Sequence, residues 1–224
     1  MRLIYFLCSM SLHKIGLMKC LIIPFLCLSV LCAQAVNSSA SVELLKSVEG
    51  YYSKKSIQID FNYAWKASEG KEFIEKGSFF FTDTWYKLIL PEQDIYFDGS
   101  SQWTYFKDRK EVQITQSSLD ESAFHPLKFA RLYKSKSFKS RVVQDEKGIA
   151  IVELVPADRD QEYHKVVLSI LKNQKQIRKV EVYYKNGDRY RIELLKHTPT
   201  KKLHITDFQL NTDGLPGVHV EDLR

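Results

Sequence analysis

Two groups of carboxylates have the residue types and spacing that could do chemistry. Asp94 and Asp98 lie four residues apart and could act as an acid and a base. Three carboxylates alternate within residues 158–162 and could bind calcium through their oxygen atoms. Carboxylates at strand ends are common, and Arg159 interrupts the second group. We therefore expect solvated turns at both places and no catalytic residue.

The other reactive residue types are scattered or confined to the N-terminus. All four cysteines lie in the first 32 residues, so the rest of the chain cannot form a disulfide framework or a cysteine-ligated metal site. Nucleotide-binding, zinc-protease and serine-hydrolase motifs are absent from the sequence. The histidines lack metal-ligand spacing, and we expect each to be exposed or half-buried: His125, His164, His197, His204 and His219. The sequence predicts no enzyme, no metal site and no cofactor.

The N-terminus has the pattern of a secretory signal peptide. Met18 and Lys19 precede an uncharged apolar run over 20–32, and Ala33-Gln34-Ala35 matches a cleavage site. We expect residues 1–35 to be this signal, with Met18 as the true start and 36–224 as one domain. A lipidated Cys32 is disfavoured because Leu31 precedes it. Cleavage removes three basic and no acidic residues, lowering the net charge from +6 to +3, too little to indicate nucleic-acid binding.

One helix and many short strands must position any site. Apolar residues recur at three- and four-residue steps from Ser41 to Tyr52, which predicts a helix capped by Ser41. From Ile57 to Trp65 they alternate, which predicts a half-buried strand. Further strands are expected at Glu72–Thr82, Trp85–Leu90, Gln93–Phe97, Gln102–Phe106, Glu111–Thr115, Phe138–Asp145, Ile149–Val155, Tyr163–Leu171, Ile177–Tyr184, Tyr190–Leu195 and His204–Leu210. A helical insertion over 117–135, broken at Pro126, interrupts them.

These elements predict a mainly β fold with about ten or eleven antiparallel strands in one meander, curled over its apolar face. That face is unusually rich in aromatic residues in the first half of the chain. An ordinary packed core and a groove for an acyl chain both fit this pattern. An acyl chain needs a dry groove without unsatisfied polar groups, and each buried methylene contributes about 0.8 kcal/mol.

Four stretches resemble the LolA/LolB family of periplasmic lipoprotein carriers. The strand at Ser56–Phe61 follows the amphipathic helix, and Glu75–Phe81 resembles the family's second strand. The most specific match is Phe97–Tyr105, which resembles the family's S-D-G-K-x-x-W-x-Y hairpin. The ending, Asp207–Asp222, resembles a family pattern with aromatic and Gly-Val residues. The resemblance covers nearly all of residues 41–224.

The resemblance implies an incomplete antiparallel β-barrel with a helical lid over an apolar cavity. It implies a monomeric periplasmic carrier that binds acylated lipoproteins, touches membrane surfaces transiently and has no catalytic activity. Its partners would be an inner-membrane ABC transporter that releases lipoproteins and an outer-membrane acceptor. The alternative is a periplasmic sensor module on the same fold that binds lipids or lipoproteins without delivering them.

The expected site has two parts. Side chains of the strands would line the lipid-binding cavity: Phe61, Tyr63, Trp65, Phe79, Phe81, Tyr86, Leu88, Leu90, Ile95, Trp103 and Tyr105. Side chains of the helices would form the lid: Leu44, Leu45, Val48, Phe124, Leu127, Phe129 and Leu132. The faces assigned after Thr82 depend on register, because a slip of one residue inverts every side chain.

One family feature is missing from the sequence. The family usually has an arginine in the turn after the second strand that holds the lid closed. Here residues 82–84 read Thr-Asp-Thr, without arginine, and Lys87 could substitute only if the register slips. The resemblance therefore leaves the closing of the lid unexplained.

Overall fold

The computed structural model of the chain describes residues 38–119 and 125–224. The expected signal peptide, residues 1–35, and the expected lid residue Phe124 lie outside the described residues. The elements described below belong to one compact unit of the chain. Within the described ranges, no helix is long and apolar enough to cross a membrane.

The first element is the helix α1, Ser39–Tyr52. Its N-cap is Ser38 rather than the expected Ser41, because the Ser38 side chain accepts a hydrogen bond from the Ser41 amide (3.2 Å). Leu45, Val48 and Tyr52 recur at three- and four-residue steps and are fully buried. The helix therefore packs through one apolar stripe, as its sequence period predicts.

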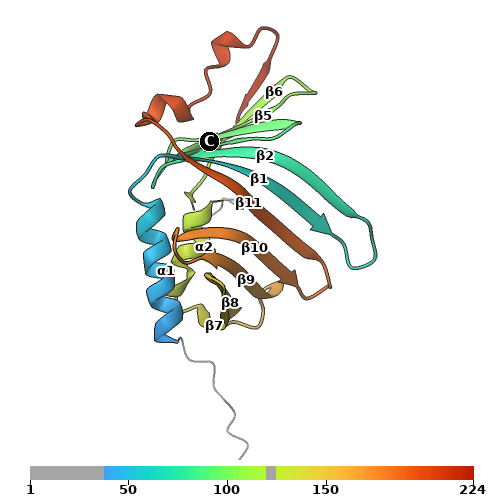
Figure 1. Cartoon of the computed structure of the whole chain (residues 1–224). Helices are drawn as coiled ribbons and strands as arrows, with labels where there is room; N and C mark the ends of the chain where they lie inside the picture. The colour runs from blue at the N-terminus through green and yellow to red at the C-terminus, as the bar shows by residue number, and fades with distance from the viewer. Residues whose placement is uncertain (1–37, 120–124) are drawn as a thin grey trace, which may run out of the picture. The chain divides into compact units, whose positions relative to one another are not determined.

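Twelve strands form one sheet. Their order is β12-β6-β5-β4-β3-β2-β1-β11-β10-β9-β8-β7, with β7 and β12 at the two edges, so the sheet is open and curved (Figure 1). The first six strands are β1 (Ile57–Lys66), β2 (Glu72–Phe81), β3 (Tyr86–Ile89), β4 (Gln93–Phe97), β5 (Ser101–Phe106) and β6 (Glu111–Gln116). The others are β7 (Phe138–Glu146), β8 (Ile149–Pro156), β9 (Tyr163–Leu171), β10 (Gln176–Tyr184), β11 (Arg189–Pro199) and β12 (His219–Asp222).

Most neighbouring strands are antiparallel and joined by short turns. The turn between β10 and β11 contains the expected Asn-Gly pair, and Gly187 has a φ of +91°, which glycine adopts without strain. The chain leaves β6 near one edge of the sheet and re-enters at β7, the other edge. This crossing segment contains α2 (Pro126–Arg131) and the 3₁₀ turn η2 (Leu132–Lys134).

The core lies between one face of the sheet and the two helices. Buried side chains of α1, α2 and strands from both halves of the sheet form a single hydrophobic cluster. Figure 1 shows α1 and α2 lying together, and α1 contacts α2, β7 and β10. We call the face of the sheet that carries this cluster the lid face, and the opposite face the outer face.

The C-terminal segment differs from the expectation. Residues expected to form a strand at His204–Leu210 instead contain the 3₁₀ turn η3, Ile205–Phe208. The aspartate of η3, Asp207, accepts a hydrogen bond from the His204 amide (2.7 Å) and favours this turn. The buried Phe208 packs near Trp85, with ring centroids 6.0 Å apart. After a second turn, η4 (Thr212–Gly214), β12 pairs with β6 in parallel.

Candidate functional site

Six of the expected cavity residues are buried on the lid face. They are Phe61, Phe79, Phe81, Tyr86, Leu88 and Leu90. The rings of Phe79 and Phe81 have centroids 5.2 Å apart, and those of Phe79 and Tyr86 are 5.5 Å apart. The unbroken register between β1 and β2 places Ile57 opposite Phe81 and Ile59 opposite Phe79. The alternating sequence therefore brings these side chains to one face, as expected.

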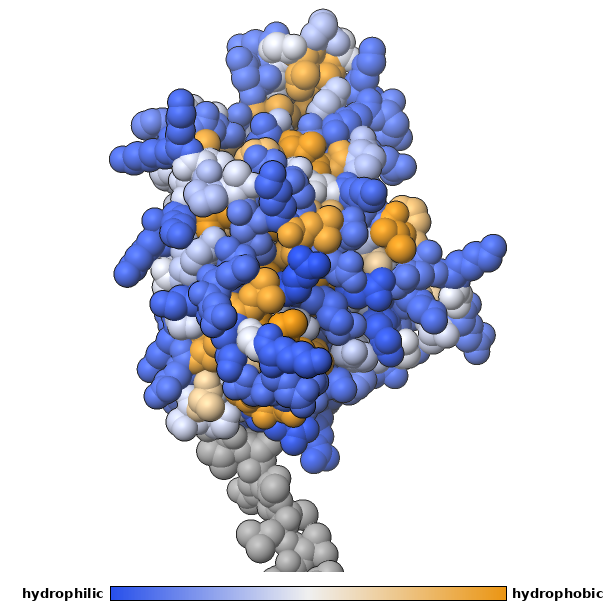
Figure 2. All heavy atoms as spheres, viewed as in Figure 1, coloured by the Kyte–Doolittle hydropathy of each residue, from blue (hydrophilic) through white to orange (hydrophobic). Residues whose placement is uncertain are grey.

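Both helices cover this aromatic surface. Of the expected lid residues, Leu45, Val48, Leu127 and Phe129 are buried, and Leu44 and Leu132 pack against the same cluster. Figure 2 shows small, separate hydrophobic patches among hydrophilic residues on the visible side of the molecule. In this state the aromatic surface is covered by the lid, rather than open to solvent.

His125 sits at the start of α2 inside this cluster. Its Nδ1 accepts a hydrogen bond from the Leu127 amide (3.2 Å), which caps the helix. Its ring centroid lies 4.9 Å from that of Phe81 and 5.5 Å from that of Phe79. Burial lowers the pKa of His125 to about 3, so the ring is neutral at physiological pH. The expectation of an exposed or half-buried histidine was wrong here, because residue 125 is both a helix cap and a core residue.

A small cavity lies at the edge of the lid, between α2 with η2 and the strands β9 to β11. It has a volume of about 170 Å³. We call it the lid-edge cavity, and its lining is Lys128, Phe129, Leu132, Tyr163, Val166, Val182, Tyr184 and Tyr190. Burial raises the pKa of Tyr163, Tyr184 and Tyr190, so these phenols stay neutral. The cavity is therefore apolar apart from phenol groups and one lysine.

The lid-edge cavity adjoins a more open hollow at the end of the strands, which we call the mouth. The mouth has a volume of about 510 Å³, and its lining is Tyr63, Trp65, Glu162, Tyr184, Asn186, Asp188 and Tyr190. Tyr184 and Tyr190 line both spaces. The rings of Tyr63 and Tyr190 have centroids 4.8 Å apart. Trp65, expected inside the cavity, is 43% exposed and lines the mouth near the end of β1.

Two expected cavity residues lie on the outer face. In the register of β3, β4 and β5, Tyr86 pairs with Phe97 and Phe97 pairs with Gln102. Trp103 and Tyr105 alternate with Gln102 and therefore point away from the lid. Ile95, which pairs with Leu88, is partly buried and packs against the lid-face cluster as expected. The prediction failed after the turn between β4 and β5, because the sequence pattern did not show which side chains of β5 face the lid.

The second half of the sheet supplies the part of the site that the sequence analysis missed. Tyr163, Val166, Val182, Tyr184 and Tyr190 line the lid-edge cavity, yet none of them was among the expected cavity residues. Their strands were predicted. The alternation of Val180, Val182 and Tyr184 was the available signal for a lid-facing row.

Charged side chains join the lid to the sheet at a cluster that we call the clasp: Glu49, Asp83, Arg131, Tyr133 and Lys134. Arg131 of α2 contacts Glu49 of α1 (Nε–Oε1 3.1 Å) and Asp83 in the turn after β2 (Nη2–Oδ1 2.5 Å). Glu49 also accepts hydrogen bonds from Tyr133 (2.8 Å) and Lys134 (2.6 Å). Burial raises the pKa of Glu49, but these hydrogen bonds outweigh burial and hold the pKa below its ordinary value.

The clasp joins the lid to the turn after β2, the turn in which the resemblance implies an arginine. The turn after the second strand carries Asp83, and the lid carries Arg131. Lys87, the other candidate, instead lies over the ring of Tyr96 at 4.9 Å to the centroid. A search for an arginine in the turn alone could not find this pairing.

The carboxylates considered for chemistry are engaged separately. Asp94 forms a salt bridge with Lys107 (2.8 Å), and Asp98 accepts hydrogen bonds from the amides of Ser100 (3.1 Å) and Ser101 (2.9 Å). Asp158 accepts a hydrogen bond from a backbone amide in its own loop. Among the residues that the structure describes, no group of three or more histidine, cysteine or acidic side chains could hold a metal ion.

Comparison with known proteins identifies the family. A family model described as "Outer membrane lipoprotein carrier protein LolA" matches residues 90–211, more than half of the chain. The chain belongs to the LolA family. Comparison of this LolA-family chain with curated protein sequences gives no match. The resemblance inferred from sequence motifs is confirmed.

The solved structures that match this chain have low sequence identity to it. An uncharacterised conserved protein from Thermus thermophilus has a TM-score of 0.51 and 11% identity, and the match covers 82% of this chain and 99% of that one. A LolA superfamily protein from Nitrosomonas europaea matches with a TM-score of 0.43 and 14% identity, covering 76% of this chain and 97% of that one. LprF from Mycobacterium bovis matches with a TM-score of 0.42 and 8% identity, covering 76% of this chain and 99% of that one. The first of these shows a similar fold.

Proposed function

We propose that this LolA-family protein carries the acyl chains of lipoproteins through the periplasm, from an inner-membrane ABC transporter to an outer-membrane acceptor, without catalysis. The observation that carries the proposal is the lid-edge cavity, which has an apolar and phenolic lining and shares Tyr184 and Tyr190 with the open mouth. Such a lining removes methylene groups from water and leaves few polar groups unsatisfied.

The size of the cavity indicates that binding requires the lid to move. A volume of about 170 Å³ equals roughly six water-sized groups at about 30 Å³ each. Six methylene groups would contribute about 5 kcal/mol, which holds the end of an acyl chain but not its whole length. We propose that α2 and η2 move away from β9 to β11, so that the chain continues over Phe79, Phe81 and Tyr86.

The proposal includes the processing and location of the chain. Residues 1–35, with translation from Met18, would direct export and be removed, and residues 36–224 would act as one periplasmic domain. The apolar run over 20–32 and the Ala33-Gln34-Ala35 site support this part of the proposal.

The test measures how tightly a purified variant captures an acylated lipopeptide when a larger side chain fills its lid-edge cavity. Val166→Phe adds an apolar ring inside the lid-edge cavity, where Val166 is buried. Val143→Phe makes the same change at an exposed position on β7 and is the matched control. We expect Val166→Phe to weaken capture at least about tenfold, which corresponds to a loss of about 1.4 kcal/mol, while the control binds normally. Equal binding by both variants would contradict the proposed binding of acyl chains in the lid-edge cavity.

A further inference from the structure

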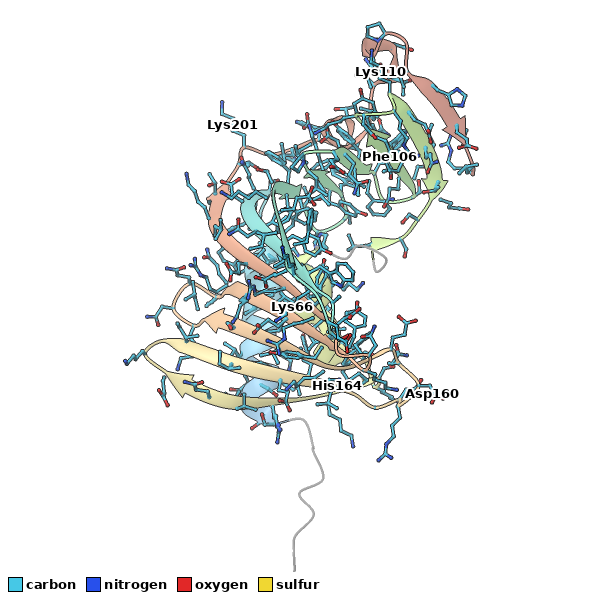
Figure 3. All side chains as sticks on the ribbon, turned by 90° about the vertical axis from the view of Figure 1, so that its right-hand side faces the viewer. Lys66, Phe106, Lys110, Asp160, His164 and Lys201 are labelled. Atoms are coloured by element: carbon cyan, nitrogen blue, oxygen red, sulfur yellow. The ribbon has the colours of Figure 1, made fainter. Side chains whose placement is uncertain are left out.

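A second hollow, which we call the rim pocket, lies at the same end of the sheet. It has a volume of about 510 Å³, and its ionisable lining residues include Lys139, Asp158, Arg159, His164 and Lys185. In Figure 3, which looks at this end of the sheet, His164 and Asp160 lie below Lys66. Lys139 alternates with the buried Phe138 and Ser140, so it points to the outer face. The rim pocket thus gathers basic groups from β7, from the loop before β9 and from the turn after β10.

These basic groups lack carboxylate partners. Within residues 38–119 and 125–224, no salt bridge involves Lys139, Arg159, His164 or Lys185. Two other cations of these strands are paired, since Arg141 lies 2.7 Å from Glu153 and Lys179 lies 3.0 Å from Glu181. An excess of unpaired positive charge in a hollow favours an anionic ligand.

Backbone contacts fix the walls of the rim pocket. The Ala157 amide donates a hydrogen bond to the Ser137 carbonyl (2.7 Å), and the Lys185 amide donates one to the Glu162 carbonyl (2.9 Å). The Lys185 ammonium group also donates to the Arg159 carbonyl, which holds its charge beside the loop. The carboxylate in the lining, Asp158, is engaged by the Asp160 amide (2.9 Å). The pocket therefore presents its cations from three connected segments.

The rim pocket adjoins the acyl site, because Tyr163 lines both the rim pocket and the lid-edge cavity. We propose that the rim pocket binds the anionic head group of an amphiphile, such as a phosphate monoester, whose acyl chain enters the lid-edge cavity. This inference rests on the proposed function, since it assumes that the cavity takes acyl chains. Hydrogen bonds from lysine and arginine to phosphate oxygens are charge-assisted and short, and they would orient the ligand.

The experiment compares two ligands that share a twelve-carbon chain, dodecyl phosphate and dodecyl maltoside, by calorimetry below their micelle concentrations. We expect the protein to bind dodecyl phosphate at least about tenfold more tightly, with an affinity that falls as salt increases. The double variant Lys139→Gln/Lys185→Gln should lose this preference and keep its affinity for dodecyl maltoside. Lys172→Gln/Lys179→Gln removes the same charge from other strands and turns and should keep the preference.

The outcomes separate this inference from the proposed function. Equal affinity of the unmodified protein for the two amphiphiles would overturn the head-group site and leave acyl binding intact. Failure of both amphiphiles to bind would overturn the proposed function as well. Inorganic phosphate is the third probe: if it binds as tightly as dodecyl phosphate, the pocket is a site for free anions and the inference is wrong.

Discussion

Replacing Glu49 by glutamine should loosen the lid, because Glu49 is the centre of the clasp. Its side chain is 14% exposed and accepts hydrogen bonds from Arg131, Tyr133 and Lys134. Loss of a hydrogen bond to a charged group costs about 1.5–3 kcal/mol. Lys134 is 55% exposed, so its ion pair adds little. Glutamine keeps one acceptor oxygen and Arg131 keeps Asp83, so we expect a net loss of about 1–2 kcal/mol in the closed state.

This loss should be visible in the movement of α2. About 1.4 kcal/mol raises the open fraction about tenfold, so amide hydrogen exchange in α2 should accelerate by that factor. Uptake of a fluorescent acylated lipopeptide should accelerate in parallel. The same changes should appear in the unmodified protein under acid conditions. The folded state lowers the pKa of Glu49, so the stabilisation is present above pH 4.5 and is lost as the pH falls through the folded value.

Glu153→Gln is the matched control for this prediction. Glu153 is 15% exposed and contacts Arg141 (2.7 Å) and Lys165 (3.9 Å), but it lies on the outer face, away from the lid. It should lose a comparable amount of global stability without faster exchange in α2. If Glu49→Gln and Glu153→Gln change exchange and uptake equally, the clasp does not hold the lid.

Three further predictions concern the packing of the site. A Cβ at Gly77 would lie 2.6 Å from the Phe61 ring and 2.8 Å from the Ile89 carbonyl, so Gly77→Ala should cost about 1–3 kcal/mol in urea unfolding; unchanged stability would contradict the packing. His125 has a pKa of about 3 when folded and an ordinary value of 6.5. The unfolded chain therefore binds more protons below pH 6.5, and stability should fall by about 2 kcal/mol between pH 7 and 5. His125→Asn, which keeps a capping side chain, should remove this part of the dependence of stability on pH. An unchanged pH dependence would refute the burial of a neutral His125. Trp65→Ala should change stability by less than about 0.5 kcal/mol but weaken lipopeptide capture, and normal capture would exclude the mouth as the entry.

The strands were predictable wherever apolar residues alternate over a long run. The alternation from Ile57 to Trp65 predicted the strand, and Ile57, Ile59 and Phe61 pack under the lid as this period of two indicates. The helix α1 was found from its stripe of Leu45, Val48 and Tyr52. Only the start of the helix differs from the prediction, because serines precede the apolar stripe at several positions and more than one of them can cap the helix.

The sequence pattern did not reveal the register of the strands or the contacts between residues that are far apart in the chain. Trp103 and Tyr105 were assigned to the lid face, but the pairing of Phe97 with Gln102 reverses their direction. β12 was missed because it is four residues long and none of its residues is buried. The clasp joins residues that are far apart in the chain, such as Glu49 and Arg131, which are separated by 82 positions. Such contacts depend on the crossing of the chain from β6 to β7, which local periodicity does not describe.

Native mass spectrometry of the protein purified from envelope extracts, followed by lipid extraction, tests the central claim most directly. The account predicts a mass that includes an acylated molecule, and the Val166→Phe variant should carry less of it. A clean ligand-free mass, together with failure to remove acylated lipoprotein from spheroplasts, would contradict the carrier function. It would make the aromatic lid face an ordinary hydrophobic core.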